Sequence, residues 1–223
     1  ARGVWTPLGR ILDISPRTII NDGELLPGGR GVLFGTKDLE FREPLGHLYL
    51  LTLPDQFITP LASGMTCSNG KVILPMMDDF LVYDIDTPRR IVERYYLDMT
   101  ERKLISNGIA IDLRNEEGLP DGMADCGDGS AIVAFYNPTR GGDGLARRYR
   151  LDSGKPVEEW ILPGSPRVTC PLLFNAQDKT VVIFATAAEG MSDEMRKTSP
   201  EAGSLFIAET KVKAYPTADV VRV

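Results

Sequence analysis

The sequence predicts an all-β protein, and three observations support this prediction. Apolar or alternating runs of strand length recur along all 223 residues, and clusters of Gly, Asn and Asp that favour tight turns separate them. Only two short polar stretches, 98–102 and 192–197, have the character of a helical turn, so the crossover helices of a parallel sheet are not expected. The expected strands are residues 31–34, 48–53, 71–74, 80–85, 91–96, 109–113, 131–136, 146–151, 157–162, 181–185 and 204–208.

Composition and charge exclude several classes of protein. Hydrophobic residues make up 43% of the chain and charged residues 25%, which is typical of a folded globular domain. No apolar run approaches the ~20 residues that a membrane-spanning helix needs. The 25 Lys and Arg against 31 Asp and Glu give a formal net charge of −6, which argues against a broad contact with phosphates. We therefore expect neither nucleic acid nor a membrane as a partner.

The metal-ligating side chains narrow the chemistry further. The single histidine, His47, excludes a zinc site built from several histidines. The three cysteines, Cys67, Cys126 and Cys170, are odd in number and have no CxxC spacing, so neither a disulfide framework nor a zinc knuckle is expected. A reducing compartment fits this cysteine usage, and we predict a cytoplasmic protein. Any metal in this protein should be held by oxygen atoms.

Three short motifs recur at a regular spacing. The first motif is Asn21 followed by Asp-Gly, and the other two are Asn69 and Asp121, each followed by Gly. Each motif comes directly ahead of an expected strand pair, and the three residues are 48 and 52 positions apart. Thr169, which also precedes a strand pair, follows Asp121 by another 48 residues. This period matches a four-stranded blade of a β-propeller. Because equivalent positions of successive blades circle one axis, we expect the side chains of Asn21, Asn69 and Asp121 to converge on a central channel.

These motifs have a simpler interpretation as turns. Asn-Gly and Asp-Gly are among the commonest hairpin dipeptides, and each motif taken alone predicts no more than that. Their regular spacing favours the convergent arrangement instead. Amide and carboxylate oxygens suit calcium or magnesium better than zinc. A single carboxylate would bind such a cation weakly, so a second acid is expected from another part of the propeller.

The motifs also occur together in a known family. They are NDG at 21–23, GT at 35–36 with GHLYLL at 46–51, SNG at 68–70, YDIDTPRRIVERYYLD at 83–98, LPDGMADCGDG at 119–129, RRYRLDSGKPVEEWILP at 147–163, VTC at 168–170 and PEAGSLFIAE at 200–209. Taken in this order, they make the chain resemble the family of the senescence marker protein, gluconolactonases and the luciferin-regenerating enzyme. The resemblance covers nearly the entire chain.

This resemblance implies a six-bladed propeller that hydrolyses lactones of sugar acids or related esters with one divalent metal in its channel. Asn69 would ligate the metal, and Asp121 would be both metal ligand and general base or nucleophile. Asn21 would bind substrate or a water on the metal, and Glu40, which follows the GTKD segment, would contact substrate. Calcium is the first choice of metal, with zinc, magnesium or manganese as alternatives.

The chain departs from the family pattern in two places. Ile19 stands where many members carry an arginine, which removes a cationic contact to substrate. The family also has a further segment in front of this sequence, with the first blade and a metal-ligating glutamate. Residues 1–223 are therefore expected to form a single propeller domain of about four and a half blades, completed by an N-terminal segment or by a second chain.

Two functions remain open on this evidence. The first is metal-assisted hydrolysis, in which the cation polarises the carbonyl of a small-molecule lactone or ester while Asp121 activates water. The second is a non-catalytic propeller that binds a ligand or a protein, with the channel residues kept as turns or as a structural metal site. Ile19 and the absent glutamate favour the second, whereas the pairing of Asn69 with Asp121 favours the first.

Overall fold

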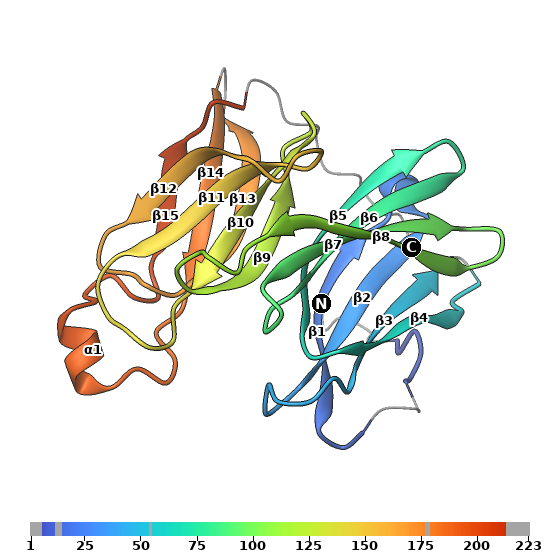
Figure 1. Ribbon diagram of the computed structural model, residues 1–223, viewed down its shortest axis with the longest axis horizontal. Coiled ribbons are helices and arrows are strands. Elements are labelled where there is room, and N and C mark those ends of the chain that lie inside the picture. The colour runs from blue at the N-terminus through green and yellow to red at the C-terminus, as the bar shows by residue number, and fades with distance from the viewer. Residues whose placement is uncertain (1–5, 12–14, 54, 177–178, 213–223) are drawn as a thin grey trace.

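The computed structural model describes residues 6–11, 15–53, 55–176 and 179–212. They form four antiparallel sheets, each built from strands in chain order (Figure 1). The first sheet contains β1 (Thr18–Leu25), β2 (Gly31–Asp38), β3 (Gly46–Thr52) and β4 (Ile58–Met65), with a 3-10 turn, η1 (Pro27–Gly29), between β1 and β2. The second contains β5 (Ser68–Met76), β6 (Asp79–Asp86), β7 (Ile91–Asp98) and β8 (Lys103–Asp112).

The other two sheets follow the same pattern. The third contains β9 (Leu119–Asp125), β10 (Ser130–Tyr136), β11 (Gly144–Arg150) and β12 (Pro156–Leu162). The fourth contains β13 (Val168–Ala176), β14 (Lys179–Thr186) and β15 (Leu205–Glu209), with the short helix α1 (Asp193–Lys197) between the last two strands. The predicted all-β propeller is confirmed, with four blades, the last three-stranded, in the described part of the chain instead of four and a half.

The first strand of each sheet lies on the inside of the arc. β1 contacts β5, β5 contacts β9, and β9 contacts β13. These four inner strands thus lie side by side, and the remaining strands fan outward from them (Figure 1). No helix in the described ranges is long and apolar enough to cross a membrane.

Apolar side chains fill the spaces between neighbouring sheets. Because side chains alternate along a strand, β10 contributes to two of these layers. Val133 and Phe135 pack toward the second sheet with Val72 and Met123, whereas Ile132 packs toward the fourth with Val182. A third layer, which includes Leu33, Leu48 and Val82, joins the first and second sheets. These layers fix each inner strand against the next.

The expectation that the three motifs precede strands is wrong, because each lies inside a strand. Asn21 lies within β1, Asn69 within β5 and Asp121 within β9. At each site the pairing with the next strand shifts register, as in a β-bulge. A Cβ atom on Gly70 would lie 2.2 Å from the Met123 nitrogen, so this glycine permits close approach of two inner strands.

One of the two expected helical turns is present. Residues 192–197 do form a turn of helix, α1, and the Ser192 hydroxyl caps it by accepting a hydrogen bond from the Met195 nitrogen. Residues 99–102 instead form the tight turn between β7 and β8, with Arg102 at φ 50°. The eleven expected strands are present, and β1, β4, β9 and β13 are strands that the sequence pattern did not predict.

Candidate functional site

The bulges of the inner strands aim polar side chains toward one another. β1, β5 and β9 each shift register at their motif, and β13 does so between Val168 and Cys170. A bulge leaves residues outside the regular ladder and re-aims their side chains. We call Asn21, Asn69 and Asp121 together the inner site.

Asn69 and Asp121 are in direct contact. The amide nitrogen Nδ2 of Asn69 donates to Asp121 Oδ1 at 2.6 Å and to the Thr87 hydroxyl at 3.0 Å. Asn21 lies beside them, because its Nδ2 donates to the carbonyl oxygen of Ser68 at 3.0 Å. Residues separated by 48 and 52 positions in the chain are therefore brought together, as their spacing predicted.

Thr87 also helps to hold this arrangement. Its hydroxyl group donates to the carbonyl oxygen of Pro120 at 2.8 Å, so it connects Asn69 to the residue just before Asp121. Thr87 lies in the turn after β6. A hydroxyl group in such a turn is common, and nothing in the sequence marks this one.

Burial dominates the electrostatics of Asp121. Desolvation raises the pKa of its carboxyl group to about 6, even though the hydrogen bond from Asn69 favours the ionised form. The negative charges of Asp22 and Glu189 act in the same direction as burial, and Lys37 acts against it. Within the described ranges no basic side chain forms an ion pair with Asp121. The site thus contains a partly buried acid without a neutralising partner among the described residues.

The neighbouring cysteine is not a nucleophile in this environment. Burial raises the pKa of the Cys67 thiol to about 12, so the thiol is protonated at neutral pH. Its sulfur lies 3.6 Å from Asn21 Nδ2 and 3.9 Å from Asn69 Nδ2. Cys67 therefore packs against the two amides as a neutral group.

The donor set of the inner site fits a hard cation. No described residue donates a hydrogen bond to the Oδ1 atoms of Asn21 or Asn69, so both amide oxygens are available as ligands, and the partly buried Asp121 supplies the carboxylate. The set contains only one carboxylate. Among the described residues, no three His, Cys, Asp or Glu side chains cluster in a way that could hold a metal. Water or residues outside the described ranges would have to complete the coordination.

Glu40 lies apart from the inner site. It is in the turn between β2 and β3, where its Oε2 atom is 3.8 Å from Arg17 and 3.6 Å from Arg42. Its side chain is 47% exposed. The structure does not bring Glu40 into contact with Asn21, Asn69 or Asp121, and its contact with substrate stays a prediction.

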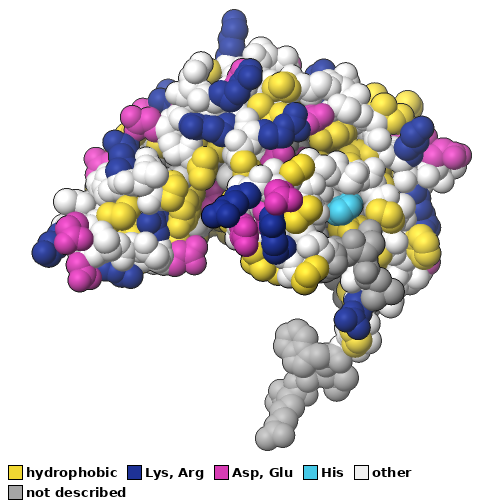
Figure 2. Space-filling view, turned by 60° about the horizontal axis from the view of Figure 1, so that its bottom comes forward, with side chains coloured by type: hydrophobic (Ala, Val, Ile, Leu, Met, Phe, Trp, Pro, Cys, Tyr) yellow, Lys and Arg dark blue, Asp and Glu magenta, His cyan; other side chains and the backbone are white. Residues whose placement is uncertain are grey.

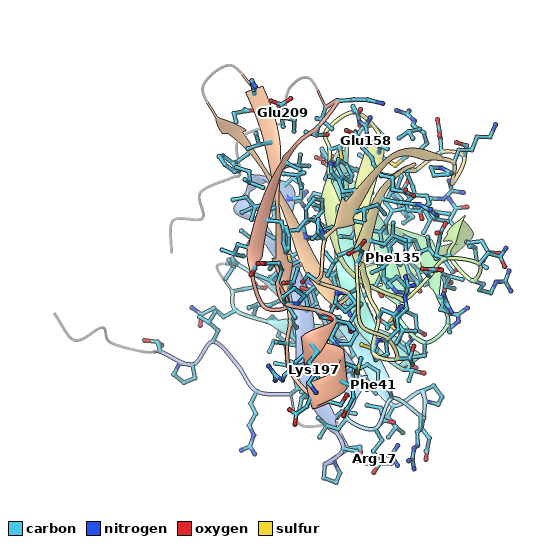
Figure 3. The ribbon with its side chains drawn as sticks, turned by 90° about the vertical axis from the view of Figure 1, so that its left-hand side faces the viewer. Arg17, Phe41, Phe135, Glu158, Lys197 and Glu209 are labelled. Atoms are coloured by element: carbon cyan, nitrogen blue, oxygen red, sulfur yellow. The ribbon has the colours of Figure 1, made fainter. Side chains whose placement is uncertain are left out.

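The turn that carries Glu40 is built around a buried aspartate. Asp38 accepts hydrogen bonds from Arg17 at 2.8 and 3.0 Å and from the backbone nitrogens of Glu40, Arg42 and Glu43. These donors hold the pKa of the Asp38 carboxyl well below its usual range. Figure 3 shows Arg17 and Phe41 of this region at the same end of the molecule as Lys197 of α1, opposite Glu158 and Glu209.

The face at that end carries charges of both signs. Figure 2 shows Lys and Arg side chains interspersed with Asp and Glu, and apolar side chains between them.

His47 contributes no second candidate for the inner site. It lies in β3, tilted against Tyr49 with ring centroids 5.7 Å apart.

A buried ion pair fixes the backbone on which Asn69 sits. Lys71 Nζ lies 3.1 Å from Asp84 Oδ1, and the two side chains are 0% and 1% exposed. The same ammonium donates to the carbonyl oxygen of Asn69 at 2.5 Å, and the Ser68 hydroxyl donates to Asp84 at 2.9 Å. The bulge removes ladder hydrogen bonds at these residues, and side chains replace them.

Comparison with known proteins identifies the family to which this chain belongs. The family described as "SMP-30/Gluconolactonase/LRE-like region" matches residues 1–188, which is most of the chain. The chain belongs to this family. The resemblance drawn from the sequence motifs is thereby confirmed.

Individual relatives agree with this assignment. An uncharacterised protein of Sulfolobus acidocaldarius is 30% identical over 94% of this chain and 69% of its own length. Regucalcin of Xenopus laevis is 28% identical over 90% of this chain and 65% of its own. A Bacillus subtilis protein whose name proposes a sugar lactone lactonase, YvrE, is 28% identical over 87% of this chain and 63% of its own. The chain thus spans about two thirds of the length of the curated relatives it matches.

A solved structure shares the fold. The crystal structure of regucalcin from Agrobacterium tumefaciens, described as a calcium-binding protein, superposes with a TM-score of 0.75 at 22% identity. The superposition covers 93% of this chain and 66% of that one. At this identity the likeness establishes the propeller fold.

Proposed function

We propose that the protein is a metal-dependent hydrolase that opens a lactone or a related ester, with a divalent cation held at the inner site. The observation that carries the proposal is the 2.6 Å contact between Asn69 and the partly buried, unneutralised carboxyl group of Asp121. Family membership supports the reaction class, because gluconolactonases give the family part of its name. Calcium is the cation we favour, since the donors are hard oxygens and regucalcin is among the relatives.

Asn69 and Asp121 would hold the cation, which supplies polarisation of the substrate carbonyl and stabilisation of the developing oxyanion. Asp121, when ionised, takes the proton from the attacking water as general base. In the absence of the cation, Asn69 holds that carboxylate in place through its amide nitrogen, and the Thr87 hydroxyl group accepts from the same nitrogen. Asn21 offers its free amide oxygen to a hydroxyl group of the substrate.

The test is lactone hydrolysis by the purified protein with calcium, and with calcium removed by a chelator. Asp121→Asn keeps the shape of the side chain but removes the base, so we expect kcat to fall at least ~100-fold. The matched control is Asp78→Asn, which changes an exposed aspartate in the turn between β5 and β6. Equal activity of the two variants, or full activity without a divalent cation, would refute the proposal.

A non-catalytic propeller is the second candidate. Two observations favour it. The Asn69 amide group already donates hydrogen bonds to Thr87 and Asp121, and the inner site contains a single carboxylate among the described residues. If the protein binds calcium tightly yet hydrolyses neither lactones nor aryl esters, this second function holds. A cytoplasmic location and completion of the propeller by a further segment or a second chain also stay predictions.

A further inference from the structure

Lys37 lies near the end of β2, on the strand that pairs with β1. β2 pairs with β1 so that Lys37 lies directly opposite Ile19, and cross-strand partners of this kind carry their side chains on the same face. Two positions earlier on the same face, a Cβ atom on Gly35 would lie 2.0 Å from the Ser68 hydroxyl oxygen. This face therefore looks toward β5.

The end of β2 is tied to the residues that precede Asn69. Lys37 forms a β-bridge with Cys67, and the Asp38 nitrogen donates to the carbonyl oxygen of Thr66 at 2.9 Å. Cys67 in turn contacts Asn21 and Asn69 through its sulfur. The backbone of Lys37 is thus paired with the segment that borders the inner site.

The ammonium group of Lys37 is not neutralised within the described ranges. The side chain is partly buried, yet no described carboxylate lies within 4.0 Å of it, and its Nζ lies 5.1 Å from the centre of the Phe41 ring. Arg17, on the other side of the same turn, shows the contrast, because it binds Asp38 and Glu43. A partly buried cation over an aromatic ring, without an anion, is suited to bind an anionic ligand.

We propose that Lys37 binds a carboxylate of the substrate, so that the preferred substrate is a lactone or ester carrying a second, free carboxylate group. This inference rests on the proposed function, since it names the substrate class of the inner site. The reacting carbonyl would lie at Asn69 and Asp121, and the free carboxylate would extend toward Lys37 and Phe41.

The experiment compares two lactones that differ in one group. D-glucono-1,4-lactone ends in a neutral hydroxymethyl group, and D-glucaro-1,4-lactone carries a carboxylate there. Lys37→Met removes the cation and keeps much of the side-chain volume, Lys37→Arg keeps the charge, and Lys103→Met is the matched control on an exposed lysine at the start of β8. We expect Lys37→Met to raise KM for the glucarolactone at least ~10-fold more than KM for the gluconolactone.

Wild-type protein gives a second readout that does not depend on any variant. Raising the ionic strength from ~0.02 to ~0.5 M should weaken binding of the glucarolactone more than that of the gluconolactone, because salt screens a partly exposed ion pair. Lys37→Arg should keep the preference, and Lys103→Met should not change it. Equal effects of Lys37→Met on both lactones, or equal salt dependence, would overturn the assignment.

Calorimetry separates this inference from the reaction itself. If neither lactone is hydrolysed but the glucarolactone binds and Lys37→Met weakens that binding at least ~10-fold, the proposed function fails while Lys37 remains an anion-binding residue. If both lactones are hydrolysed with equal efficiency and equal affinity in wild type and Lys37→Met, the function stands and the role of Lys37 is wrong.

Discussion

Two lysines border the inner site, and they are used in opposite ways. Lys71 has no exposed surface, lies 3.1 Å from Asp84 and donates to the backbone of Asn69. Lys37 is partly exposed and has no described carboxylate within 4.0 Å. A charge that is buried and paired maintains the shape of a site, whereas a charge left unpaired at its border is available to a ligand. We therefore expect Lys71 to contribute to stability and Lys37 to contribute to substrate binding.

The largest expected effect is on stability at Lys71. Lys71→Met leaves the Asp84 carboxylate buried without its partner, which should lower the free energy of unfolding by about 3–5 kcal/mol. Lys37→Met, at a partly exposed position, should cost about 1 kcal/mol or less. Chemical denaturation of the purified protein measures both. The double variant Lys71→Met/Asp84→Leu removes both charges and should recover most of the lost stability. Equal losses of stability in Lys71→Met and Lys37→Met would contradict the proposed difference between the two lysines.

The next effect is on calcium binding as a function of pH. The ion needs an ionised Asp121, and the pKa of this carboxyl group is about 6, so calcium affinity should be full above that value and lost as the pH falls through it. One unit below the pKa, the apparent affinity should be about tenfold weaker. Calorimetric titration over a pH series measures this.

The same calcium titration also tests the influence of Lys37 on Asp121. Lys37 lowers the pKa of Asp121, so Lys37→Met should move the midpoint of the calcium titration to higher pH. Lys103→Met, the exposed control, should leave the midpoint in place. A calcium affinity that does not change between pH ~5 and ~7.5 would show that Asp121 is not a ligand.

The smallest expected effect is at Thr87. Thr87→Val removes the hydroxyl group that accepts from Asn69 and donates to Pro120, and this should lower kcat/KM several-fold, by about 1 kcal/mol. Thr87→Ser keeps the hydroxyl group and should restore most of the activity. Steady-state kinetics on a single lactone measure both variants. If valine and serine behave alike, Thr87 does not orient Asn69.

Much of the fold and the core of the inner site could be predicted from the sequence. The regular spacing of Asn21, Asn69 and Asp121 reflects the blade repeat, and hydrophobic alternation predicted β5 and all the outer strands except β4. The inner strands β1 and β9 were missed because their Asp-Gly motifs are typical of turns. In this protein the glycines serve close packing instead: a Cβ atom on Gly122 would lie 2.5 Å from the Thr169 carbonyl oxygen.

The lysines could not be assigned from the sequence for a physical reason. Lys71 and Asp84 are 13 residues apart, and they are partners in the regular antiparallel register of β5 against β6, with the bulge starting only on the Ser68 side of Lys71. The position of Lys37 opposite Ile19 depends on β1 being a strand, which the pattern did not predict. Pairing and exposure, which separate the two functions, are properties of the folded chain.

The most direct measurement is a crystal structure of the protein grown with calcium. We expect the ion to lie about 2.3–2.6 Å from Asn69 Oδ1 and from a carboxylate oxygen of Asp121, with the Asn69 amide turned so that its oxygen faces the ion. A calcium ion bound elsewhere, with Asn69 still donating to Asp121, would contradict the shared cation on which the proposed hydrolysis depends.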